Sequence, residues 1–584
     1  MKRLMLIVIG LCCLPLIALE SDFSKLNSGF FVSDQSSESI DLKFTLPQYE
    51  LKAISQEGEL YQKIMVKGAG ALTEQGYPEL PVLTTTIAIP AQGNVEVEIL
   101  SARQSIISGI KPYPAQDESL PVSGRAFLQN ASFYNGKQEY PSRDLVVSQP
   151  MILRDLRIVT VSVSPFVYDA GAQELKVRES IDIRLRFSPE PGVNELMNHD
   201  VQISPAFAKI YESMILNWHE YRDLVVANTP PRYLIIHGNT TEPTFLAALN
   251  GFATWKRQKG ADVDIATTAT SSAGTSTSSI QTYIRNRYSN PATRPDYVIL
   301  IGDTGGSYAI PAFTNNGGGT DYPYSFMNTG DILGDLFVGR ISVENITQFL
   351  VVLEKIYLYE RDIDLDTAQW LNHMLLVGDD NPSGISTMYL SKYIKEMAEE
   401  VNPENTFTEM YGSDFDSFVT GINAAFNQGI SFYSFRGYID FPPPADGALN
   451  NSYKLPHAVI ITCATGNYSG GTAETESLIR YGTTALPKGS VTAVGMSTAS
   501  THTTFNHVLH GGIFEGIYAR GMRTMGEAVL HGKLYMHEIF GVSSAVNVEK
   551  FSHWCNLMGD PTMEVYTGIP NSFQIQTQSV IPLG

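Results

Sequence analysis

Residues 297–303 read YVILIGD, and residues 457–463 read HAVIITC. Each is a near-continuous apolar run, which is typical of a strand buried on both faces of a sheet. Helix-like stretches, such as 243–259 and 278–288, alternate with further runs of this kind, at residues 232–237, 263–266, 336–341, 373–378, 430–435 and 490–496. This alternation predicts an α/β fold with a mostly parallel sheet and helices on both faces.

Polar or reactive residues follow several of these strands. They are Asp303, Asp379, Asp380, the segment 436–440, Cys463 and the segment 497–502. Ligands of open α/β sheets bind beyond the carboxyl ends of the strands. We therefore expect these residues to gather along one edge of the sheet.

Residues 22–215 have a different pattern. Apolar and polar residues alternate in short runs, as at 95–100 and 181–187, and turn residues such as those at 189–192 separate the runs. Alternation with period two predicts strands that bury one face. This part is therefore expected to form an all-β domain, either a sandwich or a barrel.

Length and composition limit the possible classes of protein. The chain has 584 residues, of which 43 % are hydrophobic and 17 % charged, so two or three globular domains are expected. The formal net charge is -20. A surface that acidic repels phosphate backbones, so no nucleic-acid partner is expected.

The first residues resemble a signal peptide. Lys2 and Arg3 precede an apolar stretch at 4–19, which has the length of a signal's hydrophobic region. Export is the prediction, and an uncleaved anchor is the alternative. No later run approaches the roughly 20 apolar residues of a membrane helix, so we expect no span after signal removal.

Two cysteines, Cys463 and Cys555, remain after the predicted signal. They could form one disulfide, or one of them could be a reactive thiol. Cys463 ends a predicted buried strand, and the Gly-containing turn after it offers N–H groups that could stabilise an oxyanion. A helix predicted near 475–480 could lower the pKa of this thiol through its N-terminus. The alternative is a buried, inert cysteine.

Most of residues 230–566 resemble the gingipain family of secreted bacterial cysteine peptidases. The similar segments are YVILIGD (297–303), LFVGRIS (336–342), YER (359–361), TCATGN (462–467), ETESLIR (474–480) and MGDPT (558–562). In addition, GYPELP (76–81) resembles part of the family's β-rich propeptide. The resemblance implies a caspase-like fold, a Cys–His dyad with Cys463 as nucleophile, a polypeptide substrate, no cofactor, and a bacterial protein that is secreted or at the cell surface.

The predicted organisation combines these observations. It has a signal peptide at 1–20, a β-rich propeptide-like domain at 21–228, a gingipain-like α/β domain at 229–568 and a tail at 569–584. The propeptide-like domain is expected to bind the α/β domain as a partner within the same chain.

The sequence departs from the family at the dyad histidine. The family places this histidine after a glycine that matches Gly437, but here Tyr438 follows. No histidine lies between His373 and His457, and both of these begin predicted strands. Tyrosine titrates near 10 in its ordinary state and is a poor base at neutral pH. Loss of general acid–base help typically costs about 10²–10⁴-fold in rate.

Three interpretations of this departure stay open. In the first, His502 supplies the base, because its loop follows the strand at 490–496; the alternative is an ordinary exposed histidine. In the second, Tyr438 and Arg436 form an altered, slow site. In the third, the domain is a pseudo-peptidase that binds peptides or proteins outside the cell without cleaving them.

The resemblance also places an oxyanion hole at the N–H groups of Cys463 and Ile439. Arginine specificity is not expected, because segment 384–386 lacks the acidic residue that arginine-specific members have there.

Asp331 and Asp335 could hold a structural calcium ion, since hard cations take oxygen ligands. The alternative is that both residues are ordinary acidic side chains exposed to solvent.

Overall fold

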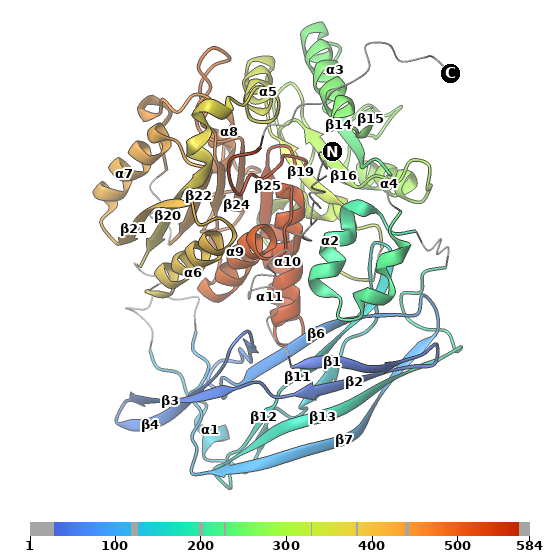
Figure 1. Cartoon of the computed structure of the whole chain (residues 1–584), viewed down its shortest axis with the longest axis vertical. Coiled ribbons are helices and arrows are strands. Elements are labelled where there is room, and N and C mark those ends of the chain that lie inside the picture. Colours follow the sequence, from blue (N-terminus) through green and yellow to red (C-terminus); the bar gives the residue numbers. More distant parts are fainter. Residues whose placement is uncertain are drawn as a thin grey trace, which may run out of the picture.

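The structure is a computed structural model that describes residues 29–117, 126–197, 202–226, 229–328, 330–380, 384–437 and 443–571. A β-rich lobe lies below an α/β lobe in the orientation of Figure 1. The predicted signal peptide and most of the predicted tail lie outside the described residues, so both stay predictions.

The β-rich lobe is a sandwich of two antiparallel sheets. The first sheet has the order β1–β2–β13–β12–β8, with β7 beside β13. Its strands are β1 (Phe30–Gln35), β2 (Ser39–Thr45), β7 (Asn94–Ser108), β8 (Glu139–Tyr140), β12 (Phe166–Asp169) and β13 (Glu174–Ser188). The second sheet has the order β10–β11–β6–β5, with β9 beside β11. Its strands are β5 (Gly70–Ala71), β6 (Pro81–Ile89), β9 (Leu145–Val147), β10 (Met151–Leu153) and β11 (Leu156–Val163).

Alternating apolar residues hold the sandwich together. Leu42 and Ile183 from the first sheet share one core with Ile87 and Val161 from the second. A separate hairpin, β3 (Tyr49–Gln56) and β4 (Glu59–Val66), extends from this lobe. The expectation of an all-β domain is confirmed, and the form is a sandwich.

The α/β lobe contains one ten-stranded sheet with the order β15–β14–β16–β19–β25–β24–β23–β22–β20–β21. Its strands are β14 (Arg232–His237), β15 (Asp262–Thr267), β16 (Tyr297–Ile301), β19 (Phe337–Ile341), β20 (His373–Asp379), β21 (Thr406–Gly412), β22 (Phe432–Arg436), β23 (His457–Ile460), β24 (Thr492–Met496) and β25 (Cys555–Met558). Every pairing is parallel except that of β24 with β25. The mostly parallel sheet is therefore confirmed.

The one antiparallel pairing corrects the expectation of a single polar edge. Because β25 runs parallel to β19 and antiparallel to β24, the two halves of the sheet run in opposite directions. The carboxyl ends of β20, β22, β23 and β24 share one edge. Asp303 follows β16 in the other half, and it instead pairs with Arg480. The expectation that Asp303 lies with Cys463 was wrong, because the sequence pattern does not encode strand direction.

Helices cover both faces of the sheet. On β20, Leu375 and Val377 pack with α7 (Phe415–Gln428), whereas Met374 and Leu376 pack with α6 (Ser386–Val401) and α9 (Thr503–Tyr518). In the other half, one face packs with α3 (Pro243–Gln258) and α5 (Ile346–Glu360), and the opposite face with α4 (Thr277–Tyr288). Two-sided burial explains why these strands read as continuous apolar runs.

The second sheet of the sandwich is also buried on both faces. All of β11 is buried. Leu153, Leu156 and Ile158 join the same apolar cluster as α2 (Pro205–Met214) and α10 (Met525–Phe540). Figure 1 shows α10 and α11 (Ala545–Trp554) reaching down to this lobe. The two lobes therefore share a core.

Candidate active site

The loop after β23 carries Cys463. The strand was predicted to continue to this cysteine, but it ends at Ile460, where the Thr465 hydroxyl donates to the Ile460 carbonyl oxygen at 2.8 Å. Ala464 then takes a left-handed φ of 60°. The N–H of Ala464 donates to the carbonyl oxygen of Thr498, just after β24, at 2.8 Å. The N–H of Gly466 donates to the carbonyl oxygen of Met496, the last residue of β24, also at 2.8 Å. These bonds fix the loop against the end of β24.

The Cys463 thiol lies in contact with a hydroxyl group. Its sulfur is 3.2 Å from Oγ1 of Thr501, and the Asn506 side chain donates to the same oxygen at 3.0 Å. Cys463 is free and partly exposed, whereas Cys555 is free and buried. The disulfide alternative is therefore wrong, because Cys555 begins β25 in the core while Cys463 lies on the loop beyond β23.

His502 lies next to Thr501 in the chain. Its ring contacts the rings of Phe505 and Phe551 at centroid distances of 6.0 and 5.9 Å. Burial lowers the pKa of His502, and the Asp117 charge from the β-rich lobe opposes that shift. His502 is thus close to the loop of Cys463, but the hydroxyl at the sulfur belongs to Thr501. A role of His502 as base stays a prediction.

Tyr438 and Ile439 lie outside the described residues, so their proposed roles stay predictions. Two other expectations can be placed. His373 and His457 begin β20 and β23, which puts them at the edge opposite Cys463. His457 is buried and interacts with Thr492 and Tyr359.

Arg436 was expected near the site, but the two histidines that lie beside it were missed. Arg436, at the end of β22, donates through Nε and Nη2 to Nδ1 of His507, at 3.0 and 2.9 Å. Its Nη1 donates to the carbonyl oxygen of Ile461. Nε2 of His510 lies 2.8 Å from Oγ of Ser434. His507 and His510 are three residues apart on α9, and that helical spacing is the signal that could have found them.

The segments that carry the family resemblance form buried ion pairs. Arg340 binds Asp321 through two bonds, at 2.7 and 2.6 Å. Arg480 pairs with Asp303 at 3.0 Å and with Glu476 at 2.8 Å. Glu476 also accepts from the N–H of Ala473, which fixes the start of α8 (Glu474–Arg480). These residues position the helix that follows the loop of Cys463.

A third buried cluster joins two of those segments. Lys256 pairs with Glu360 at 2.8 Å and with Asp560 at 2.7 Å, and all three side chains are fully buried. Glu360 lies in the YER segment and Asp560 in the MGDPT segment. The resemblance of these two segments to the gingipain family therefore reflects a shared buried scaffold and not contacts with a substrate.

Asp331 and Asp335, considered above for calcium, accept hydrogen bonds from the β-rich lobe. Asp331 accepts from the N–H of Ile152 at 2.8 Å, and Asp335 from that of Arg154 at 2.6 Å. Among the described residues, no group of three or more His, Cys, Asp or Glu side chains is arranged to hold a metal ion. The two carboxylates thus have a role at the contact between the lobes, and calcium binding stays an untested prediction.

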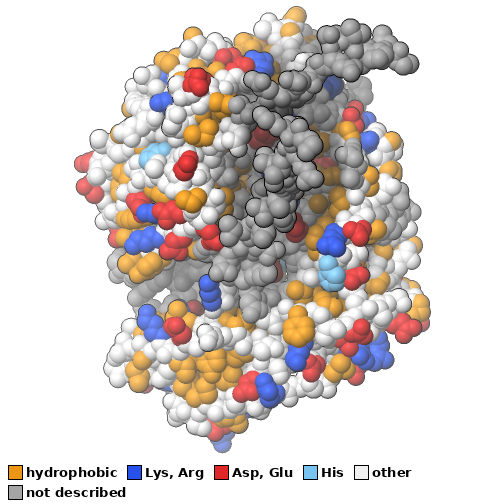
Figure 2. Space-filling model, in the orientation of Figure 1, with side chains coloured by type: hydrophobic (Ala, Val, Ile, Leu, Met, Phe, Trp, Pro, Cys, Tyr) orange, Lys and Arg blue, Asp and Glu red, His pale blue; other side chains and the backbone are white. Residues whose placement is uncertain are grey.

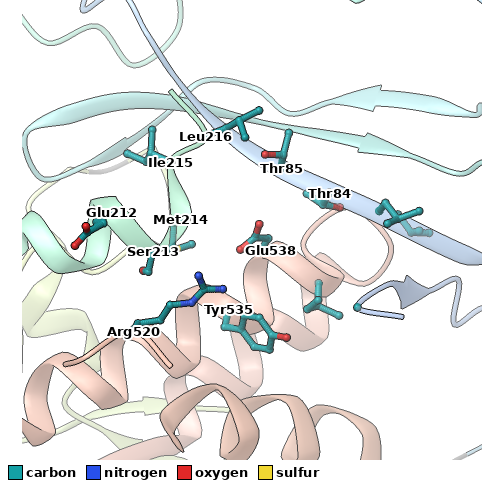
Figure 3. Close-up of a pocket in the computed structure, with 14 residues that line it drawn as sticks. Thr84, Thr85, Glu212, Ser213, Met214, Ile215, Leu216, Arg520, Tyr535 and Glu538 are labelled. Carbon is teal, nitrogen blue, oxygen red and sulfur yellow. The ribbon is translucent and has the colours of Figure 1, made fainter. Parts of the chain in front are cut away.

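A cavity of about 270 Å³ separates parts of the two lobes. Figure 3 shows Thr84 and Thr85 of β6 facing Tyr535 and Glu538 of α10, with Arg520 beside them. Glu538 is half-buried at this contact, and its loss of solvation raises its pKa to about 8. The residues that line this cavity do not include Cys463. It is a gap in the contact between the lobes and no part of the candidate site.

Figure 2 shows hydrophobic side chains gathered on the lower, β-rich lobe. On strands β1, β3, β4 and β7 of this lobe, the exposed large hydrophobic residues are Phe31, Leu51, Leu60, Met65, Val97, Ile99, Leu100 and Ile106; Val193 and Met197 are exposed after β13. In the part of the chain covered by the structure, no helix has the length and apolar character needed to cross a membrane.

Two known families match consecutive parts of this chain. Residues 226–566 match peptidase family C25, and residues 21–221 match the propeptide of the same family, Propeptide_C25. The chain belongs to peptidase family C25. The gingipain-like cysteine peptidase family expected from the sequence is therefore confirmed.

Relatives of this C25 protein include gingipains of Porphyromonas gingivalis. Lys-gingipain W83 is 25 % identical over 438 residues, which cover 72 % of this chain and 24 % of the relative. Gingipain R2 is 23 % identical over 532 residues, which cover 86 % of this chain and 69 % of the relative. The C25 chain thus spans about a quarter of the length of the Lys-gingipain.

A solved structure shares the fold. The crystal structure of the Arg-specific cysteine proteinase gingipain R has a TM-score of 0.53 and 21 % sequence identity, and the match covers 60 % of this chain and 82 % of that one. The complex of the pro- and mature domains of the Porphyromonas gingivalis protein RgpB matches with the same TM-score. The caspase-like fold of this C25 chain is thereby confirmed.

Proposed function

We propose that this C25 chain is a cysteine endopeptidase that is secreted or held at the cell surface of a bacterium. It would hydrolyse peptide bonds through the thiolate of Cys463. The observation that supports this proposal is a free, partly exposed thiol on the loop after β23, in a chain of a peptidase family. The β-rich lobe would act as its prodomain, since it matches the family's propeptide.

In the proposed reaction, the Cys463 sulfur attacks the carbonyl carbon of a peptide bond, and the carbonyl oxygen becomes an oxyanion. The N–H groups of Cys463 and Ile439 would donate to that oxyanion. The amine leaves after it gains a proton, and the acyl group remains on sulfur as a thioester. Water then hydrolyses the thioester, which releases a carboxylate and restores the thiol.

The proton transfers distinguish this chain from its family. With Tyr438 at the histidine position, the leaving amine would receive its proton from Tyr438 or from water. Loss of general acid–base help typically lowers a rate by about 10²–10⁴-fold. The proposed enzyme is therefore slow, and the second candidate function is a pseudo-peptidase that binds peptides or proteins. The presence of Tyr438 is the observation that favours that second candidate.

A peptide-based, thiol-directed inactivator tests the nucleophile. Intact mass spectrometry is expected to show one adduct on the natural protein and on the matched control Cys555→Ala, but none on Cys463→Ala. The same three proteins are then incubated with denatured protein substrates, before and after proteolytic removal of the β-rich lobe. Cleavage that depends on Cys463 supports the endopeptidase. Labelling without cleavage favours the pseudo-peptidase, and no labelling in either form excludes a working nucleophile.

A further inference from the structure

Arg436 is a buried cation beside the nucleophile loop. It is 1 % exposed, and its Nη1 donates to the carbonyl oxygen of Ile461, two residues before Cys463. The Thr462 hydroxyl donates to the carbonyl oxygen of Gly437 at 2.9 Å. The end of β22 and the segment leading to Cys463 therefore lie side by side, and the guanidinium lies between them and α9.

Within the described ranges, Arg436 makes no ion pair with a carboxylate, and its side chain forms hydrogen bonds with Ile461 and His507. Burying an unbalanced charge is costly. Burial lowers the pKa of Arg436 to about 9, and the opposing influence is negative charge at Cys463. A thiolate at Cys463 is thus the anion that would balance this guanidinium.

Two histidines lie on the other side of Arg436, and neither can supply the positive charge. Nδ1 of His507 accepts from the guanidinium, so this nitrogen carries no proton. Burial and then the charge of Arg436 hold the pKa values of both His507 and His510 well below the ordinary range. His507 is therefore neutral and holds Arg436 in place by accepting two of its N–H groups.

We propose that Arg436 replaces the protonated dyad histidine as the cation that balances the Cys463 thiolate, and that His507 is a positioning residue for Arg436. This inference rests on the proposed role of Cys463 as nucleophile. The arrangement supplies a charge but no transferable proton, since an arginine does not release its proton near neutral pH. Protonation of the leaving amine would therefore need a different donor.

Alkylation by iodoacetamide measures the thiolate without any need for peptide cleavage. The rate at Cys463 is followed by peptide mass spectrometry from pH 5.5 to 9.5. An opposite charge within about 4–6 Å typically shifts an ionisation equilibrium by about 1–3 pH units. We expect Arg436→Met to slow alkylation at pH 6 by at least about tenfold, with little change at pH 9.5, and Arg436→Lys to retain most of the natural rate at pH 6.

His507 provides a second, independent pair of variants. His507→Asn keeps an acceptor near the position of Nδ1 and should stay close to the natural profile, whereas His507→Leu removes it and should slow alkylation at pH 6 only. A purely structural role would change the rate at every pH or in both variants.

If circular dichroism shows that Arg436→Met does not fold, the two His507 variants decide. The proposal is overturned if folded Arg436→Met or His507→Leu keeps the natural pH profile. That result would leave peptide cleavage by Cys463, tested above, unaffected.

Discussion

The main-chain N–H of Arg154 in the β-rich lobe donates to Oδ1 of Asp335 in the α/β lobe, at 2.6 Å. The side chain of the same arginine donates to Asp296 at 2.7 Å and to the carbonyl oxygens of Pro295 and Asp335, both at 2.9 Å. Arg154 is 3 % exposed and lies over the ring of Phe207. One turn of the β-rich lobe is therefore anchored in the other lobe.

Arg154→Ala is expected to weaken this anchor. It leaves Asp296 buried without its guanidinium partner, and breaking a buried pair in this way costs roughly 3–5 kcal/mol. Urea denaturation of the full chain measures the loss of free energy of unfolding. The control is Arg103→Ala, whose side chain is 72 % exposed and should cost less than about 1 kcal/mol. Equal losses in the two variants would contradict the anchor.

Asp335 should make the stability of this contact depend on pH. Burial, and then the charge of Asp331, raises the pKa of Asp335 from 3.8 to about 7. The pKa of Asp335 is higher in the folded state than in the unfolded state, so folding favours the protonated carboxyl group. The contribution of this group to the free energy of unfolding is therefore full below pH 3.8 and is lost as the pH rises through 7. The contribution is at most about 4 kcal/mol. Thermal unfolding between pH 5 and 8 should therefore show a fall in stability that is smaller in Asp335→Asn; an unchanged slope would refute this assignment.

Lys256→Met should destabilise the α/β lobe. The replacement leaves Asp560 buried without a cation, whereas Glu360 keeps its ion pair with Lys259. A loss of roughly 3–5 kcal/mol in the free energy of unfolding is expected, because uncompensated buried charges are costly. Lys52→Met, at an exposed position of β3, is the control and should be nearly neutral. A loss below about 1 kcal/mol in Lys256→Met would show that the cluster adds little.

Gly466→Ala should disturb the loop that carries Cys463. A Cβ atom at this position would lie 2.8 Å from the backbone of Gly495, which cannot move without shifting β24. Overpacking of this kind costs about 1–3 kcal/mol. Labelling of Cys463 by the peptide-based inactivator should fall as well. In the same loop, Gly470→Ala meets only the Asn467 side chain, at 3.2 Å, and should label normally; equal labelling of both variants would count against a rigid loop.

Tyr438→His introduces the residue type that the resemblance to the gingipain family predicts at this position. General acid–base help is typically worth about 10²–10⁴-fold, so peptide hydrolysis should rise by at least about tenfold near pH 7. Cleavage of a fluorogenic peptide library measures the change, and Tyr438→Phe is the control that adds no base. If the histidine variant is no faster than the natural protein, the position does not contact the reacting groups.

Periodicity was sufficient for most of the fold. β14 was predicted with its observed bounds, and β19 and β20 to within one residue, because strands covered on both faces must be continuously apolar. β21 was missed, since this edge strand is only partly buried and reads TFTEMYG. β25 was missed because four residues, CNLM, are too short to show a period.

The sequence by itself determined the alternation of strands and helices, the all-β first part, the family, and Cys463 as the candidate nucleophile. These features depend on local patterns and on spacing along the chain. Only the tertiary structure decided that the halves of the sheet run in opposite directions, that Arg436 and His507 meet beside Cys463, and that Arg154 reaches Asp335. The physical reason is that burial, hydrogen bonding and charge act across space, between residues that are tens to hundreds of positions apart in the chain.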